Sequence, residues 1–260
     1  MRPLTVRNTE VIYGVHPVFE ALRAGRRKFH RIFLTPGGVS SRRLDKLRKL
    51  AATHNIPVGN TSASMLERLA QSEHHQGVVA RVSPFPVTAL AEVLASDAAG
   101  ADRRFLIILD NLTDPRNLGA IVRSALAVEA EAILLPKDRS AGPTPAVSKT
   151  SAGALEHTRL VRVTNVVATM RQLREHGCWL YGLEPTADQS VYEVDFTGSV
   201  ALVVGGEERG IRPLVKKNCD VLLSIPQSDR LESLNASVAA AIAMYEVYRQ
   251  RLANSTNGHA

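Results

Sequence analysis

Five polar residues between positions 117 and 235 have the types and positions from which a reaction site can be built. Asn117 and Arg123 lie in NLGAIVR, Glu207 lies in GGEERG, and Ser233 and Asn235 lie in SLNAS. Amide, hydroxyl and carboxylate groups can orient a nucleophile or accept its proton, and a guanidinium can bind phosphate or support charge developing on oxygen. Each segment follows an apolar run typical of a strand, and ligands gather where parallel strands end. The sequence therefore predicts a polar ligand site assembled from three separate segments.

The helix that follows FLIILD positions the first segment. It can begin at Asp114-Pro115 or at Asn117, because Asp and Asn side chains cap free backbone N–H groups and Pro fits the first turn. At about 100° per residue, Arg123 lies more than about 90° from the centre of the apolar stripe, which predicts an exposed side chain. An ordinary surface arginine is the simpler alternative. The stripe expected to be buried consists of Leu118, Ile121, Val122, Ala125 and Leu126.

The other two segments combine tight turns with a helix N-terminus. The glycines of GGEERG let the backbone approach a ligand closely, whereas the absence of GKS, GKT and GxGxxG leaves nucleotide hydrolysis and Rossmann-type dinucleotide binding without support. Ser233 and Asn235 lie at the start of an Ala-rich helix, where free N–H groups favour an electron-rich ligand. A capping role alone is the simpler alternative for Glu207, Ser233 and Asn235. One stripe of the Ala-rich helix carries Val238, Ile242, Tyr245 and Tyr248.

Positive charge is concentrated near the N-terminus. The chain has a net charge of +7, yet between Ala21 and Leu50 ten basic residues face one acid, a local charge of +9. In the helix SRRLDKLRKLAATHN the leucines form the buried stripe, which leaves most basic residues on the surface. We expect Arg42, Arg43 and Lys46 to contact the phosphates of a nucleic acid. A solvated helix face is the alternative.

The cysteine, histidine and hydropathy patterns argue against three classes of protein: metal-binding proteins, hydrolases and membrane proteins. The only cysteines, Cys178 and Cys219, have no metal-ligand spacing, and the histidines have no spaced partner or Ser or Cys nucleophile motif, so neither a metal site nor a hydrolase is expected. No apolar run approaches the about 20 residues that span a bilayer, and MRPLTVRNTE has no signal core. We therefore expect a reduced, cytoplasmic protein without a membrane partner.

Apolar periodicity divides the chain into two domains. Residues 1–82 predict a small α/β domain, with helices in HPVFEALRAG, SRRLDKLRKLAATHN and SMLERLA and strands in RIFLT, near Ile56–Val58 and in GVVARV. Residues 83–104 predict a linker with a short helix near Thr88–Ala95, and residues 253–260 predict a flexible tail. Residues 105–252 alternate helices with the strands FLIILD, EAILLP, TRLVRV, CWLYGL, VALVVG and VLLSIP, which is typical of a parallel sheet covered on both faces.

The three polar segments resemble the three motifs of the SpoU (TrmH) class of RNA ribose 2′-O-methyltransferases, which belongs to the SPOUT superfamily. VIYGVHPVFEAL, HHQGVVARV, LLPKDRSA and LVRVTN also resemble the subgroup that methylates a guanosine in the peptidyl-transferase region of 23S ribosomal RNA. The resemblance runs in the family's order from about Val11 to Leu252. Two segments depart from the family pattern: Glu208-Arg209 follows the motif glutamate, and the loop Gln227–Glu232 is more charged than is usual.

The resemblance implies an rRNA (guanosine-2′-O-)-methyltransferase that acts in ribosome biogenesis with S-adenosylmethionine as cofactor. It also implies a trefoil knot in the C-terminal α/β domain, a homodimer built on that domain, and an N-terminal module that binds substrate RNA. Arg123 would act as phosphate clamp and electrostatic activator, because a guanidinium is a poor base. Methylation of transfer RNA and a non-catalytic RNA-binding role in ribosome assembly remain alternatives. The matching residues imply catalytic roles for Asn117, Arg123, Glu207, Ser233 and Asn235 and cofactor contacts at Gly205, Ile225 and Leu234.

Overall fold

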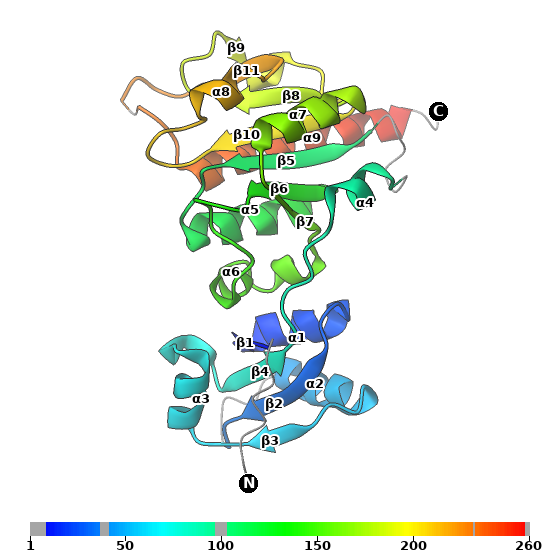
Figure 1. Ribbon diagram of the computed structural model, residues 1–260, viewed down its shortest axis with the longest axis vertical. Coiled ribbons are helices and arrows are strands. Elements are labelled where there is room, and N and C mark those ends of the chain that lie inside the picture. The colour runs from blue at the N-terminus through cyan, green and yellow to red at the C-terminus, as the bar shows by residue number, and fades with distance from the viewer. Residues whose placement is uncertain (1–8, 37–41, 97–102, 231, 258–260) are drawn as a thin grey trace. The chain divides into compact units, whose positions relative to one another are not determined.

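The computed structural model describes residues 9–36, 42–96, 103–230 and 232–257 (Figure 1). Backbone contacts divide the chain into two compact units. The small unit consists of Met1–Pro86 together with Pro143–His157, and the large unit consists of Val87–Gly142 and Thr158–Ala260. The chain therefore contributes to the small unit twice.

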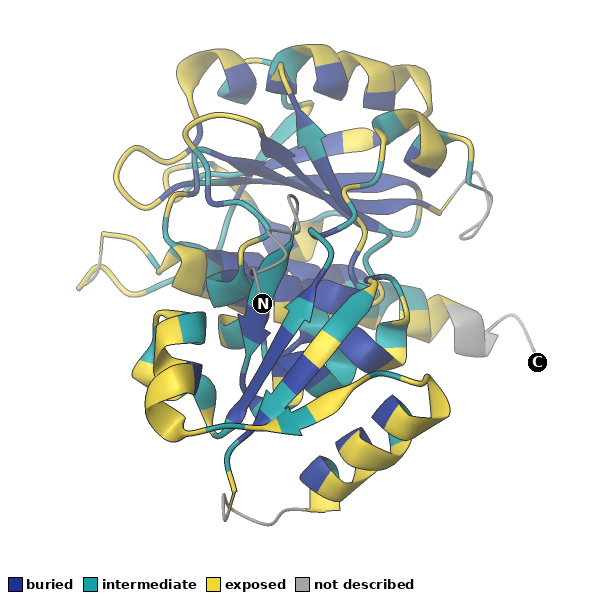
Figure 2. Ribbon diagram, turned by 60° about the horizontal axis from the view of Figure 1, so that its bottom comes forward, coloured by how far each residue is buried: buried dark blue, intermediate teal, exposed yellow. Residues whose placement is uncertain are grey.

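The small unit is a four-stranded sheet with the strand order β1-β4-β2-β3. β4 runs antiparallel to β1 and β2, whereas β3 runs parallel to β2. Helices α1 and α2 bury apolar side chains against one face of this sheet. Figure 2 shows the helices with buried residues on one side and exposed residues on the other. The elements are β1 (Glu10–Tyr13), α1 (Val15–Ala24), β2 (Phe29–Leu34), α2 (Arg42–Thr53), β3 (Val58–Asn60), α3 (Ala63–Ala70), η1 (Glu73–His75), β4 (Val78–Val82), α6 (Pro145–Thr150) and η2 (Ala154–His157).

The large unit contains a parallel sheet of seven strands in the order β7-β6-β5-β10-β8-β11-β9. The predicted α/β class with a parallel sheet is confirmed. β5 is buried at every residue, as expected of a central strand covered on both faces. The strands are β5 (Phe105–Asp110), β6 (Ala132–Pro136), β7 (Leu160–Val163), β8 (Trp179–Leu183), β9 (Gln189–Ser190), β10 (Val200–Gly205) and β11 (Val221–Ser224).

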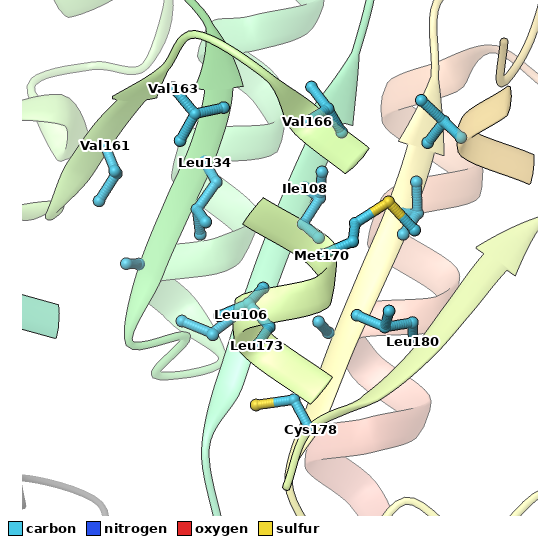
Figure 3. Close-up of a cluster of buried hydrophobic side chains, with 14 of the residues drawn as sticks. Leu106, Ile108, Leu134, Val161, Val163, Val166, Met170, Leu173, Cys178 and Leu180 are labelled. Atoms are coloured by element: carbon cyan, nitrogen blue, oxygen red, sulfur yellow. The ribbon is translucent and has the colours of Figure 1, made fainter. Parts of the chain in front are cut away.

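Helices cover both faces of the large sheet. On one face, Leu106 and Ile108 of β5 pack with Met170 and Leu173 of α7 in the cluster of Figure 3. On the other face, α5 and α9 pack against each other and α9 contacts β10. The helices are α4 (Leu90–Leu94), α5 (Pro115–Ala127), α7 (Val166–Glu175), η3 (Val191–Glu193), α8 (Pro213–Lys216) and α9 (Ala236–Asn257).

Several local predictions differ from the structure. β1 and β9 were not expected, because two to four residues are too few for a periodic pattern. β3 begins at Val58, so the strand near Ile56–Val58 was placed too early. On α5, Leu126 is 37% exposed, although the other stripe residues are buried. α9 runs to Asn257 and so includes most of the predicted tail, while residues 258–260 lie outside the described residues.

On α9 the aromatic stripe does not define the buried face. Val238 and Tyr245 are 46% and 52% exposed. This helix is apolar on several sides because it is rich in alanine, so periodicity could not select the side that packs. The buried apolar residues are Ala240, Ala243, Met244 and Val247.

The segment Pro143–His157 differs from the sequence-based division, which placed it inside a continuous domain over 105–252. It packs against α1 and β1 in the small unit. Buried Glu156 forms an ion pair with the equally buried Arg27 at 2.7 Å and accepts a hydrogen bond from Ser148 at 2.7 Å, and Arg27 also binds Glu10. Arg27 is one of the ten basic residues counted between Ala21 and Leu50, but it is an internal structural residue. Charge alone could not reveal this, because its partner lies 129 residues away.

Candidate functional site

The loop between β10 and α8 is fixed by the end of β5. Asp110 is fully buried and accepts hydrogen bonds from the backbone N–H of Arg212 at 2.8 Å and from its guanidinium at 2.6 and 2.9 Å. A Cβ atom at Gly205 would lie 2.1 Å from the backbone of Gly210, and Gly206 and Gly210 form a bridge. Glycine is therefore required at position 205, and Glu207 lies in the narrow turn between the bridged glycines.

The three polar segments meet in one hydrogen-bonded relay. Asn117 Nδ2 donates to Glu207 Oε1, and Asn235 Nδ2 donates to Asn117 Oδ1 at 3.2 Å. Asn235 Oδ1 in turn accepts from the backbone N–H of Ser237 at 2.9 Å and so caps the first turn of α9. The relay places one residue of each segment within hydrogen-bond reach of the next. Because both polar atoms of the Asn117 amide are engaged, its orientation is fixed.

Asn117 is available for this relay because another residue caps α5. Asp114 is the N-cap and Pro115 occupies the first turn, so the helix begins at the first of the two predicted positions. The backbone N–H of Arg116 and then its guanidinium hold the pKa of Asp114 below its ordinary value. The Asp114 carboxylate is thus committed to the helix end, where negative charge is favourable.

Arg123 is exposed on α5, as predicted, but it is not part of the relay. It lies six residues after Asn117, which corresponds to about 9 Å along a helix axis. Among the described residues, none forms a hydrogen bond or an ion pair with its guanidinium. Arg123 is therefore a free cation near the relay, available to an anionic ligand.

A pocket of about 310 Å³ adjoins the relay at the carboxyl ends of β8, β10 and β11. Its lining includes Glu207 and Ser233. It also includes all three residues expected to contact the cofactor, Gly205, Ile225 and Leu234. Asn117, Arg123 and Asn235 do not line it. The volume lies at the lower end of the about 300–1,000 Å³ typical of ligand pockets.

The lining of the pocket fits S-adenosylmethionine. Leu183, Leu223 and Ile225 provide an apolar surface for an adenine ring, and the exposed backbone of the Gly205 turn offers N–H and C=O groups to its polar edge. Glu184 and Glu207 contribute carboxylates to the lining, which favours a positively charged ligand, and the Glu184 carboxylate also pairs with Lys216 at 3.0 Å. A small-molecule cation with an aromatic base is thus the class of ligand that these residues suit.

Other chemistries find less support. Burial raises the pKa of the Cys178 thiol to about 11 and that of Cys219 to about 12, so both thiols stay protonated and unreactive. In the part of the chain that the structure describes, no cluster of three or more His, Cys, Asp or Glu side chains could hold a metal ion. No described helix is long and apolar enough to cross a membrane.

Sequence reasoning missed the clamp between Asp110 and Arg212. The signal was a carboxylate at the end of the otherwise apolar run FLIILD, where an acid has to find an internal partner. It also missed Leu183 and Glu184 at the end of β8, as well as Ala239 of α9, which line the pocket. Apolar pocket walls give no signal of their own, because the same residues would serve equally well in a core.

Comparisons with known proteins agree with this geometry. Residues 104–245 match the SpoU rRNA Methylase family, and residues 11–88 match the RNA 2′-O ribose methyltransferase substrate binding family. The chain is 38% identical over 246 residues to the 23S rRNA (guanosine-2′-O-)-methyltransferase RlmB of Escherichia coli strain K12, covering 94% of this chain and 99% of that protein. The protein of the same name from Shewanella oneidensis is 39% identical over 249 residues, covering 95% and 99%.

Solved structures show the same fold. The SpoU methyltransferase AviRb from Streptomyces viridochromogenes, in complex with the cofactor AdoMet, has a TM-score of 0.79 and 25% identity over 95% of this chain and 92% of that chain. The TrmH/SpoU tRNA modifying enzyme of A. aeolicus covers only 60% of this chain, with a TM-score of 0.53 and 26% identity. The similarity to AviRb therefore extends over both units, whereas the tRNA enzyme matches a part.

Proposed function

Because the chain belongs to the SpoU rRNA methylase family, we propose that it transfers a methyl group from S-adenosylmethionine to the ribose 2′-hydroxyl of a guanosine in 23S ribosomal RNA. The observation that carries the proposal is the relay Asn235–Asn117–Glu207 beside a pocket that fits the cofactor. Relatives named for this reaction align over nearly the whole chain. The protein is thus an rRNA methyltransferase that acts in ribosome biogenesis.

The relay would orient the acceptor hydroxyl. Glu207 uses Oε1 to accept from Asn117, while its Oε2 has no hydrogen-bond partner among the described residues. An ionised carboxylate only accepts hydrogen bonds, so a ribose 2′-OH at the pocket would donate to this oxygen and place its proton there. When bound, S-adenosylmethionine would supply the electrophilic methyl group. Ser233 would complete the site from the pocket wall.

Arg123 would bind the substrate phosphate next to the acceptor ribose. Its guanidinium is exposed and unpaired within the described chain, and a planar fork matches a phosphate in two places at once. Held there, it would also favour negative charge that develops on the 2′-oxygen. This role needs no proton transfer by the guanidinium itself.

The small unit would supply affinity for ribosomal RNA. Arg42 and Lys46 are exposed on α2, as the prediction required. Arg43 is half-buried, and its guanidinium lies 5.8 Å from the centre of the Phe19 ring. All three remain proposed RNA contacts, with Arg43 held in position by the aromatic ring. A ribosomal RNA substrate would place the protein in the cytoplasm.

The proposal includes a homodimer and the family's trefoil knot. Val238 and Tyr245 lie seven residues apart on the exposed side of α9, and Leu126 of the adjacent α5 is also exposed. We propose that a second copy covers these exposed apolar side chains, as the resemblance to the family implies. Sedimentation velocity would show a dimer for the unmodified chain and a monomer for Tyr245→Arg; a monomer for both would refute this part.

The activity is tested by mapping 2′-O-methylation across ribosomal RNA from cells that lack the protein. We expect one guanosine of 23S RNA to lose its methyl group, with recovery when the unmodified chain is supplied and not when Arg123→Ala is supplied. Loss of a transfer RNA modification would instead support the tRNA alternative. Full recovery of the methyl group with Arg123→Ala would remove Arg123 from the mechanism. An unchanged methylation map in cells that lack the protein would support a non-catalytic role in ribosome assembly.

A further inference from the structure

One face of the small-unit sheet carries two arginines and no acid among its strand residues. Side chains alternate across a strand, and Ile32, Leu34, Val78, Ala80 and Val82 belong to the core formed with α1 and α2. The residues between them point to the opposite face, which we call the outer face. The strand residues of the outer face are Val11, Tyr13, Arg31, Phe33, Gly59, Val79 and Arg81.

Part of the outer face is covered and part is open. Helix α3, whose Leu66 is fully buried, packs against η1, β1 and β4. Val79, at the η1 end of β4, is 1% exposed. Arg31 and Arg81 lie two residues further along the paired strands, where Arg31 is exposed and Arg81 half-buried. The open part of the outer face is therefore the part that bears the charges.

Arg31 and Arg81 are direct cross-strand partners in the antiparallel pair β2·β4. Residues in such pairs have Cβ atoms about 5 Å apart, and like charges placed opposite each other destabilise a sheet. Among the described residues, no carboxylate forms an ion pair with either guanidinium. The open part of the outer face thus carries two positive charges without a carboxylate partner among the described residues, and an anionic ligand would neutralise them.

The Arg31 guanidinium is already held in place. It lies 5.5 Å from the centre of the Phe33 ring, and it extends over Gly59 of β3, where a Cβ atom would come within 2.8 Å of Nη2. A side chain at position 59 would have to displace it. An arginine plane backed by an aromatic ring is a surface on which single-stranded nucleobases stack.

We propose that the outer face binds a single-stranded segment of the substrate RNA, with Arg31 and Arg81 contacting its backbone phosphates and the Arg31–Phe33 pair supporting an adjacent base. This inference rests on the proposed function in one respect, the choice of RNA as the ligand. Helices α1 and α2 share the opposite, core side of the sheet. The site is thus distinct from the surface of Arg42 and Lys46 on α2.

The test is fluorescence-anisotropy titration of the full chain with a labelled 12-nucleotide single-stranded RNA of mixed sequence. Arg31→Gln/Arg81→Gln is compared with Arg23→Gln/Arg68→Gln, which removes equal charge from exposed positions on α1 and α3. We expect the first variant to bind several-fold more weakly and its salt slope to fall by about 0.7 for each lost phosphate contact. The control variant should stay close to the unmodified chain.

Two further measurements separate a binding site from a structural role. Without RNA, Arg31→Gln/Arg81→Gln should melt at a higher temperature than the unmodified chain, because the like-charge pair is removed. Calorimetry should show unchanged binding of S-adenosylmethionine. Affinity equal to that of the control would overturn the inference, and so would a defect confined to a blunt RNA duplex of equal length. Failure of the proposed function would appear differently, as absence of methyl transfer by the unmodified chain.

Discussion

Replacing Glu207 by glutamine isolates the charge of the relay from its shape. Glutamine can still accept a hydrogen bond from Asn117 through its amide oxygen, so the relay geometry should survive. The substitution removes the negative charge that strengthens the hydrogen bond from Asn117 and would strengthen the hydrogen bond from the acceptor hydroxyl. A hydrogen bond to a charged group contributes about 1.5–3 kcal/mol and a neutral one about 0.5–1.5 kcal/mol, so the difference is about 1–1.5 kcal/mol.

Solvent exposure lowers the free-energy difference between the charged and the neutral hydrogen bond, whereas contact with the acceptor hydroxyl preserves it. Glu207 is exposed in the unbound protein, which reduces the part of the effect that acts on Asn117. Bound RNA and cofactor would exclude water from Glu207, so the part that acts on the acceptor hydroxyl should persist. About 1.4 kcal/mol corresponds to a tenfold change in rate, and we therefore expect methyl transfer to slow by about tenfold or more.

The assay is single-turnover methyl transfer to a 23S RNA fragment at saturating RNA and labelled S-adenosylmethionine. Glu208→Gln is a matched control, because Glu208 is adjacent, exposed and lines the same pocket but has no described part in the relay. We expect this variant to transfer the methyl group within about twofold of the normal rate, since exposed charges contribute about 0–1 kcal/mol. A slower reaction in Glu208→Gln than in Glu207→Gln would refute the assignment of Glu207 and shift the register of the turn by one residue.

Arg123→Ala and Arg123→Lys should both lose methyl transfer yet bind S-adenosylmethionine within about threefold by calorimetry, because only a planar fork holds the phosphate; near-normal turnover in either would remove Arg123 from the mechanism. Neutralising Arg42 and Lys46 together should lower the salt slope of RNA binding by about 0.7–0.9 for each lost phosphate contact; an unchanged slope would identify a merely solvated helix face. Glu156→Gln should lower the free energy of unfolding by about 3 kcal/mol in urea titrations, because it leaves Arg27 buried without its main partner; an unchanged unfolding free energy would show that the buried pair is not needed.

Local chemistry determined much of the large unit. The apolar strands could be read from FLIILD, EAILLP and VALVVG because central parallel strands are buried on both faces and need no alternation. Asp114 and Pro115 placed the start of α5 within one turn, and the glycines marked the turn after β10. The motif segments therefore indicated the three members of the relay, Asn117, Glu207 and Asn235.

Other features depended on contacts between residues far apart in the sequence. Glu156 belongs to the small unit because it meets Arg27, and no local pattern carries that information. Asp110 fixes the turn around Glu207 through Arg212, 102 residues later. The side of α9 that packs was decided by its fit to α5 and β10, since an alanine-rich helix is apolar on several sides.

The fold class, the strands of the parallel sheet and the residue types of the site could be predicted from local periodicity, capping and charge. That Asn117 connects Glu207 to Asn235 while Arg123 stays apart from them became visible in the folded chain alone. The folded chain also places Arg31 and Arg81 opposite each other across two strands. These outcomes depend on register and on distance in space, and neither is encoded in the spacing of residues along the chain.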